Sequence, residues 1–143
     1  QAQILDLMRN LGQETGAAMI MITHDLGVVA EMADAVAVMY AGRIVEAGST
    51  AQVFDDPQHP YTLGLMSSMP SLTGRAERLV TIPGTVPGAL DMPVGCRFAA
   101  RCPFATEGCA KAPPLTDLGG GHRVACWHAP LEAADPVPAR VTA

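Results

Sequence analysis

Residues 17–40 read AAMIMITHDLGVVAEMADAVAVMY, and this stretch decides the fold class. Every residue from Ala17 to Ile22 is apolar, which is typical of a strand that is buried on both faces of a sheet. Residues 26–33 then place apolar side chains at helical spacing, and residues 34–40 return to a β-like run. This order of strand, helix and strand indicates an α/β fold.

The sequence on either side of this stretch predicts further regular elements. Residues 2–13 carry an apolar stripe at helical spacing, so we expect a helix there. The Ala-Gly pair at 41–42 signals a tight turn, and residues 43–46 after it have a strand pattern. The chain is therefore expected to form a hairpin after the helix over residues 26–33.

Two short helices are expected after this hairpin. Ser49 or Thr50 can cap the first helix, which we expect to run through Phe54. The second is expected over residues 61–69, because the proline at position 60 fixes the entry of a helix but cannot lie in its interior.

The composition changes near Ser71, where Pro, Gly and Cys become dense and helical periodicity ends, apart from a strand candidate over residues 78–82. We therefore expect an α/β part over residues 1–70 and a small, irregular, Cys-rich extension over residues 71–134. Residues 135–143 alternate Pro and Ala with little to bury, so we expect a disordered tail.

The composition of the 143-residue chain limits its function. Apolar residues make up 49% of it, which is enough for a packed core, and the net charge is −5. Because Lys and Arg are not clustered, nucleic acid is not an expected partner. No run approaches the roughly 20 apolar residues that span a bilayer, and the start lacks a signal-peptide pattern, so we expect a cytoplasmic protein. Helical periodicity begins at Gln1 without a capping residue, and we expect a fragment that starts inside a helix.

His24 is the first candidate functional residue, because it follows the expected buried strand directly. Ligands of open α/β sheets bind at the carboxyl ends of the strands. A histidine there can donate a hydrogen bond to a phosphate oxygen or orient an attacking water molecule. The alternative is a histidine that only caps or packs against the end of the strand.

Residues 21–34 and 36–48 resemble the switch-histidine segment and the following hairpin of ABC transporter ATPases. The resemblance implies the C-terminal part of a P-loop NTPase domain. It also implies that His24 is the switch histidine, which contacts the γ-phosphate of ATP held between two ATPase subunits. Asp25 would support the same turn, and residues 1–5 would belong to the helix after the D-loop.

Three motifs of that family do not occur in the sequence. They are the Gly-x-x-x-x-Gly-Lys-Ser/Thr phosphate loop, the signature loop, and the strand that ends in a Mg-binding Asp and a catalytic Glu. Without them, no backbone nest cradles the phosphates and no carboxylate holds the metal. We therefore expect that residues 1–143 do not hydrolyse ATP alone.

Residues 55–62 read DDPQHPYT and resemble a stretch that distinguishes the ATPases of oligopeptide and dipeptide importers, including some nickel importers. This implies an ATP-binding and ATP-hydrolysing subunit that uses ATP with Mg at the cytoplasmic side of the cell membrane. The implied partners are a second ABC ATPase subunit, membrane permease subunits and, indirectly, an extracytoplasmic peptide-binding protein. The cargo stays open between peptides, nickel and another solute. Locally, the same residues read as a Pro-bracketed turn with Tyr61 packed on the sheet domain.

Four cysteines in the second half follow the spacing Cys-x5-Cys-x6-Cys-x16-Cys. Disulfides are not expected in a reducing cytoplasm, and a metal centre would stabilise a segment that has little core. Structural zinc usually takes Cys-x2-4-Cys pairs, whereas wider loops suit an iron-sulfur cluster, and unligated thiols remain the third alternative. The candidate metal ligands are Cys96, Cys102, Cys109 and Cys126.

Residues 95–126 also resemble the C-terminal extension of the same importers, which implies a four-iron four-sulfur cluster on these cysteines. His122 and His128 could replace or support a ligand, or simply pack. The arginines at positions 97, 101 and 123 could offset the charge of a cluster, or lie solvated on the surface. A stand-alone iron-sulfur or zinc module is the alternative to an importer subunit.

Overall fold

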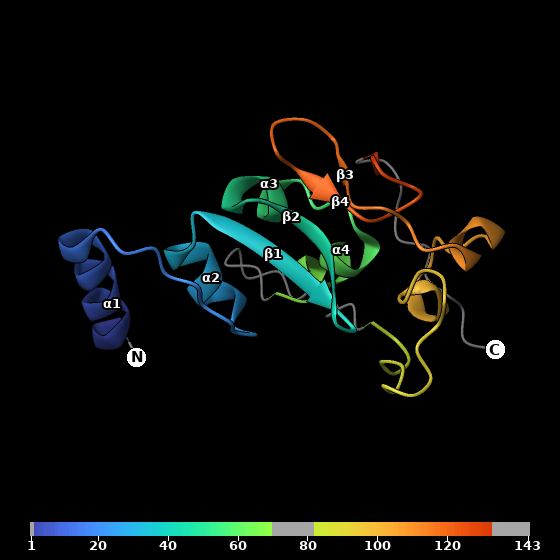
Figure 1. Ribbon diagram of the computed structural model, residues 1–143, viewed down its shortest axis with the longest axis horizontal. Coiled ribbons are helices and arrows are strands. Elements are labelled where there is room, and N and C mark those ends of the chain that lie inside the picture. The colour runs from blue at the N-terminus through green and yellow to red at the C-terminus, as the bar shows by residue number, and fades with distance from the viewer. Residues whose placement is uncertain (1, 70–81, 133–143) are drawn as a thin grey trace. The chain divides into compact units, whose positions relative to one another are not determined.

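The computed structural model describes residues 2–69 and 82–132 (Figure 1). The chain divides into two compact units, Gln1–Asp34 and Ala35–Ala143. Among the described residues, no helix has the length and apolar character that crossing a membrane requires. Three expectations lie outside the described residues: the domain boundary near Ser71, nearly all of the strand candidate over 78–82, and the tail over 135–143.

The first unit contains two helices, α1 (Ala2–Thr15) and α2 (Leu26–Met32). Both confirm the helices expected from apolar spacing, and their ends lie within two residues of the expected positions. Arg9 on α1 connects the two helices: its guanidinium donates to the backbone oxygen of Glu31 at 3.4 Å and pairs with the Glu31 carboxylate at 3.6 Å.

The strand expected over Ala17–Ile22 is wrong for the structure as described. This segment has no regular secondary structure, and the side chains of Ile20 and Ile22 are 92% and 97% exposed. The apolar run indicates a strand with neighbours on both sides, but the described part of the first unit contains no other strand whose backbone could pair with it. A run of six residues without such a partner has no ladder of hydrogen bonds to hold it extended.

The second unit begins with the expected hairpin. Strand β1 (Ala35–Tyr40) pairs antiparallel with β2 (Arg43–Ser49). The two residues between them, Ala41 and Gly42, have φ values of 47° and 78°. Positive φ at both central positions is the requirement of a type I′ hairpin turn, which glycine meets without steric cost.

The C-terminal segment adds two short strands to the hairpin (Figure 1). Strand β4 (Arg123–Val124) pairs antiparallel with β2 and places Val124 opposite Glu46, while β3 (Thr116–Asp117) pairs antiparallel with β4. The resulting sheet has the order β1-β2-β4-β3. The expected α/β class is thus confirmed as a mixture of helices with one sheet, and the pairs in that sheet are antiparallel.

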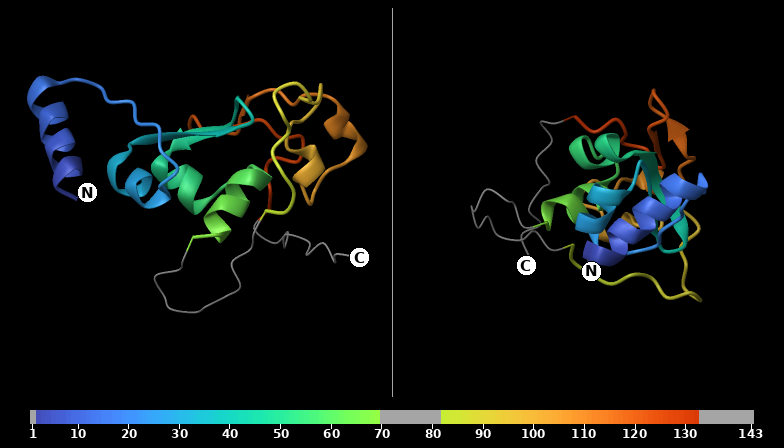
Figure 2. Two further views of the ribbon diagram at one scale, coloured as in Figure 1. Left: turned by 90° about the horizontal axis from the view of Figure 1, so that it is seen from below. Right: turned by 90° about the vertical axis from the view of Figure 1, so that its left-hand side faces the viewer.

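Both expected short helices are present and lie on the same side of the hairpin (Figure 2). Ser49 caps α3 (Thr50–Asp55) with a capping box: its hydroxyl accepts from the Gln52 N–H at 3.2 Å, and the Gln52 side chain accepts from the Ser49 N–H at 2.9 Å. Helix α4 (Pro60–Ser67) starts with the proline as predicted, and His59 caps it.

Three aromatic rings join the hairpin to the rest of the second unit. Tyr40 on β1 lies 4.8 Å from Tyr61 on α4 and 5.1 Å from Phe98, measured between ring centroids. Phe98 is 2% exposed and precedes the 3-10 helix η1 (Ala99–Arg101). The expectation that Tyr61 packs on the sheet is therefore confirmed, and the cysteine-bearing segment shares the same core.

Candidate functional site

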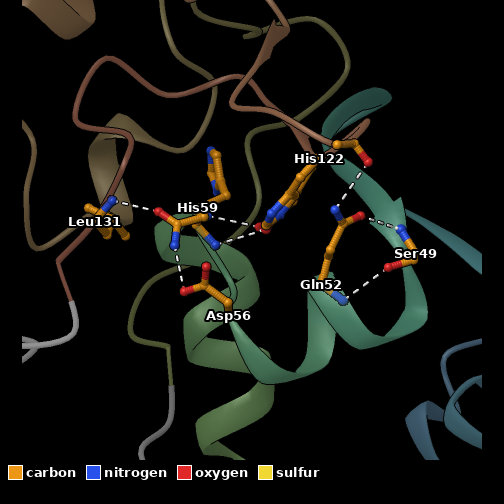
Figure 3. Close-up of polar contacts among 9 residues, drawn as sticks. Ser49, Gln52, Asp56, His59, His122 and Leu131 are labelled. Atoms are coloured by element: carbon orange, nitrogen blue, oxygen red, sulfur yellow. Dashed lines mark hydrogen bonds and ion pairs between the residues drawn. The ribbon is translucent and has the colours of Figure 1, made fainter.

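The most enclosed charged group among the described residues is the carboxylate of Glu46 on β2, which is 0% exposed. Its Oε1 accepts hydrogen bonds from the Gln58 N–H at 2.8 Å and from His122 Nε2 at 2.7 Å, and its Oε2 accepts from the His59 N–H at 2.8 Å. His59 and His122 are labelled in Figure 3, where dashed lines mark the hydrogen bonds of this arrangement. A buried carboxylate needs such partners, because an uncompensated one is very costly.

This arrangement, which we call the Glu46 network, connects three parts of the chain that are far apart in sequence. Glu46 comes from β2, its two backbone donors from the 55–62 stretch, and His122 from the C-terminal segment. Gln58 extends the network, because its side-chain oxygen accepts from the Leu131 N–H at 2.6 Å (Figure 3). The 55–62 stretch is therefore a turn that also holds β2 and the C-terminal segment together, and we call it the clamp.

Sequence reasoning did not select Glu46. The signal available was a single carboxylate between apolar residues in a predicted strand, with Val45 and Ala47 as its neighbours. The sequence suggests His122 as a support or substitute for a metal ligand, or as a packing residue, and the structure places its ring on Glu46 in a buried pair.

His59 has an enclosed, neutral imidazole. Burial lowers the pKa of its side chain to about 4. Its Nδ1 accepts from the Tyr61 N–H at 3.0 Å, as the cap of α4. The proton of the neutral ring is therefore on Nε2, which leaves that nitrogen as a donor.

The four cysteines are gathered in the second unit, and all are free thiols. Cys102 and Cys109 are buried, and Cys96 and Cys126 are half-buried. The Cys96 N–H donates to the Cys109 backbone oxygen at 2.9 Å and so ties two of the cysteine loops together. Burial, together with repulsion from the other three sulfurs, raises the pKa of the Cys102 thiol to about 11.

Backbone N–H groups point at three of the four sulfurs. The Cys96 sulfur accepts from two of them, the Cys102 sulfur from one and the Cys126 sulfur from two, and each lowers the pKa of its thiol against the effect of burial. Such N–H to sulfur contacts stabilise thiolates and are a common support of sulfur ligands. The donors are Phe98 and Ala99, Phe104, and His128 and Ala129, respectively.

The donor chemistry of this region fits a thiolate-bound metal, but the geometry does not establish a site. Within residues 2–69 and 82–132, no group of three or more His, Cys, Asp or Glu side chains is arranged to hold a metal ion. His128 does lie near one thiol, with its Nε2 3.9 Å from the Cys109 sulfur and 3.3 Å from the Thr106 hydroxyl. The metal centre stays a prediction.

The three arginines near the cysteines have different positions. Arg101 donates to the backbone oxygens of Pro83 at 2.8 Å and Ile82 at 3.1 Å, so it fixes the backbone of these two residues. Arg97 donates to the backbone oxygen of Ala41 in the hairpin turn. Arg123 is exposed on β4, as the solvated alternative expects.

His24 lies in the exposed loop between the 17–22 run and α2. Asp25, its neighbour, accepts from the Val28 N–H at 3.2 Å and caps α2, and its own N–H donates to the Thr23 hydroxyl at 3.0 Å. Asp25 thus has a local structural role. Nothing in this loop tests the role expected of His24, which stays a prediction.

The chain is similar to known proteins over both the hairpin and the cysteine segment. Residues 45–109 match the model of the family described as "Oligopeptide/dipeptide transporter, C-terminal region". Residues 45–109 belong to this family. The matched range contains Glu46, the 55–62 clamp and the first three cysteines, and it ends before Cys126.

Two curated relatives of the chain are ATP-binding proteins by name. A putative peptide import ATP-binding protein of Brucella ovis is 54% identical over 133 residues, which cover 88% of this chain and 39% of the relative. The oligopeptide transport ATP-binding protein OppD of Haemophilus influenzae is 54% identical over 127 residues, or 89% of this chain and 39% of the relative. The chain thus spans about two fifths of the length of these curated relatives.

Proposed function

We propose that the protein serves as the ATP-binding and ATP-hydrolysing subunit of an ABC importer that takes up oligopeptides or dipeptides. The observation that carries this proposal is the 54% identity to peptide import ATP-binding proteins over 88% of the chain. By the same reasoning, its partners are a second ATPase subunit and membrane permease subunits at the cytoplasmic face of the membrane, and ATP with Mg is its nucleotide.

Within this function, we propose that His24 contacts the γ-phosphate of ATP. The exposure of its loop supports the proposal, because a phosphate can reach an exposed imidazole without any rearrangement of packed side chains. The Asp25 cap supports it too, since the cap fixes the backbone on the C-terminal side of His24. Residues 1–143 contain no phosphate loop. His24 can therefore contact ATP in this way only in a protein that has a phosphate loop in addition to these residues.

His24→Ala, made in a subunit that carries a phosphate loop and is assembled with its permease, is expected to lower ATP turnover by roughly 10² or more. The physical reason is the loss of a positioned hydrogen-bond donor, while nucleotide affinity changes less. Gln13→Ala, at an exposed position of α1, is the matched control and should keep normal turnover. Normal peptide-dependent turnover in the His24 variant would refute the assignment.

We propose separately that the four cysteines bind a four-iron four-sulfur cluster, with zinc and unligated thiols as the competing outcomes. The support is the donor set: four free thiols in one unit, three of them already accepting backbone N–H groups. Such a cluster, when bound, would cross-link loops that share only a small core, so its binding free energy would contribute to folding.

Protein expressed and purified without oxygen is expected to contain iron and sulfide and to be brown. Cys102→Ser should abolish the iron content and lower the melting temperature, because metal binding and folding are coupled. Ala105→Ser is the matched control: it adds the same hydroxyl at an exposed position between two cysteines and removes no thiol. A colourless product that contains zinc, or no metal, would exclude the cluster.

A further inference from the structure

A cavity of about 240 Å³ lies between the β1–β2 hairpin and the segment that carries Cys96. It is lined by residues 40, 43–45, 59, 95–98, 113, 115 and 125. Its volume lies below the roughly 300–1,000 Å³ that is typical of pockets for drug-sized ligands, so its occupant would be small. Much of the wall is apolar, from Ile44, Val45, Phe98, Pro113 and Leu115.

Arg97, one of the residues that line this cavity, has an unsatisfied donor. The guanidinium of Arg97 donates to the Ala41 backbone oxygen through one of its terminal nitrogens, but its Nε is buried and has no acceptor among the described residues. A buried donor without an acceptor costs about 1–3 kcal/mol, and native structures rarely leave one. The Nε itself has no accessible surface, so an acceptor in the cavity would reach it, and remove this cost, once the Arg97 side chain turns.

The other polar residues of the lining are Arg43 and His59, which donate, and Tyr40 and Cys96, whose hydroxyl and thiol can both donate and accept. Arg43 also lines the cavity, and its guanidinium has no hydrogen bond or ion pair within the described part of the chain. His59 contributes a ring whose Nε2 carries the proton, because its Nδ1 accepts from Tyr61. None of the described residues that line the cavity is Asp or Glu. The lining therefore offers positive charge and donors against an apolar wall.

We propose that this cavity binds a small organic carboxylate. Its oxygens accept hydrogen bonds from Arg97 and Arg43, because the planar guanidinium matches a carboxylate in geometry and charge. Its hydrocarbon part packs against Ile44 and Leu115, which are 43% and 40% exposed at the rim. The apolar wall favours an organic monoanion over inorganic phosphate, which carries more charge to desolvate. The proposal stands apart from ATP hydrolysis and from peptide transport.

Isothermal titration of the full 143-residue chain with isovalerate tests this proposal. Isovalerate has a carboxylate on a short branched hydrocarbon, and 3-methylbutan-1-ol has the same hydrocarbon without the charge. We expect saturable binding of isovalerate and at least tenfold weaker binding of both the alcohol and inorganic phosphate. Equal binding of the alcohol would mean an unspecific apolar hollow, and equal or tighter binding of phosphate would mean a general anion site. Either result would overturn the assignment, as would a lack of saturable binding.

Variants locate the binding site. Arg97→Gln should weaken isovalerate binding about tenfold or more, the value of one charge-assisted hydrogen bond. Arg43→Gln should weaken it in the same direction, and this variant keeps the test decisive if the Arg97 variant fails to fold, because Arg43 is exposed. Arg123→Gln, on β4 and outside the cavity lining, is the matched control and should bind normally. If Arg97→Gln removes bound iron but leaves isovalerate binding unchanged, Arg97 serves the cysteines and the carboxylate site is refuted.

Discussion

Replacing Glu46 by alanine is expected to lower the free energy of unfolding by about 3 kcal/mol or more, because each buried donor that is left without an acceptor costs about 1–3 kcal/mol. The change leaves the backbone N–H groups of Gln58 and His59 and the ring of His122 without their acceptor, in a region where the carboxylate itself is 0% exposed. Water cannot replace three hydrogen bonds there without opening the contact between β2 and the clamp.

The experiment is equilibrium unfolding in urea. The single tryptophan, Trp127, is a suitable fluorescence probe, because its Nε1 donates to the Lys111 backbone oxygen at 2.9 Å and it therefore reports on the C-terminal segment. Glu132→Ala is the matched control, since this glutamate is exposed and its loss should change stability by less than about 0.5 kcal/mol. Equal stabilities of the two variants would mean that the network is not needed for the fold.

A second variant separates charge from hydrogen bonding. Glu46→Gln keeps the shape and one acceptor oxygen, but it turns an amide N–H₂ toward donors that the carboxylate now satisfies. We expect the free energy of unfolding of Glu46→Gln to lie between that of the wild type and that of Glu46→Ala. His122→Ala should cost less than Glu46→Ala, because the carboxylate would still accept from two backbone N–H groups.

The parts of the fold that were predictable from the sequence are those whose causes are local. The turn at Ala41 and Gly42, the Ser49 cap and the helix that starts at Pro60 each depend on residues within a few positions of one another. Interactions between residues so close in sequence can be predicted without knowledge of the tertiary structure. The run from Ala17 to Ile22 failed for the opposite reason, since a strand requires partners that its own residues cannot specify.

For the candidate site, the sequence allowed only the types of the functional residues to be predicted. The four cysteines and His24 were visible as residue types, but their surroundings depend on contacts between distant positions. Glu46 and His122 are 76 positions apart, and β4, which helps to bring His122 to Glu46, is only two residues long. A strand of this length has no periodicity to detect. Its pairing with β2 follows from the packing of the whole second unit.

Gly95→Ala is expected to disrupt the cysteine segment and to cost about 3 kcal/mol or more, at the upper end of the overpacking range. A Cβ at this position would overlap the backbone oxygen of Cys109 and would lie 2.6 Å from the carbonyl carbon of Ala110. Both are backbone atoms, so no side-chain rotation relieves the clash. The backbone must move apart and break the hydrogen bond from the Cys96 N–H to Cys109, which joins the two cysteine loops.

Gly108→Ala is the control for this clash, because it lies in the same segment and its added Cβ would come no closer than 3.7 Å to the Thr106 hydroxyl. Thermal unfolding measures the stability of both variants, and the rate of thiol modification by a disulfide reagent measures the exposure of Cys102 and Cys109, which are buried in the wild type. We expect both thiols to react faster in the Gly95 variant only. If both variants melt and react alike, the close approach of the two loops is not what holds the cysteines together. If Gly95→Ala melts early and the two thiols become reactive, position 95 requires glycine because the backbone of a loop 14 residues away lies too close for a side chain. The order of the cysteine segment then depends on this backbone contact before any metal is bound.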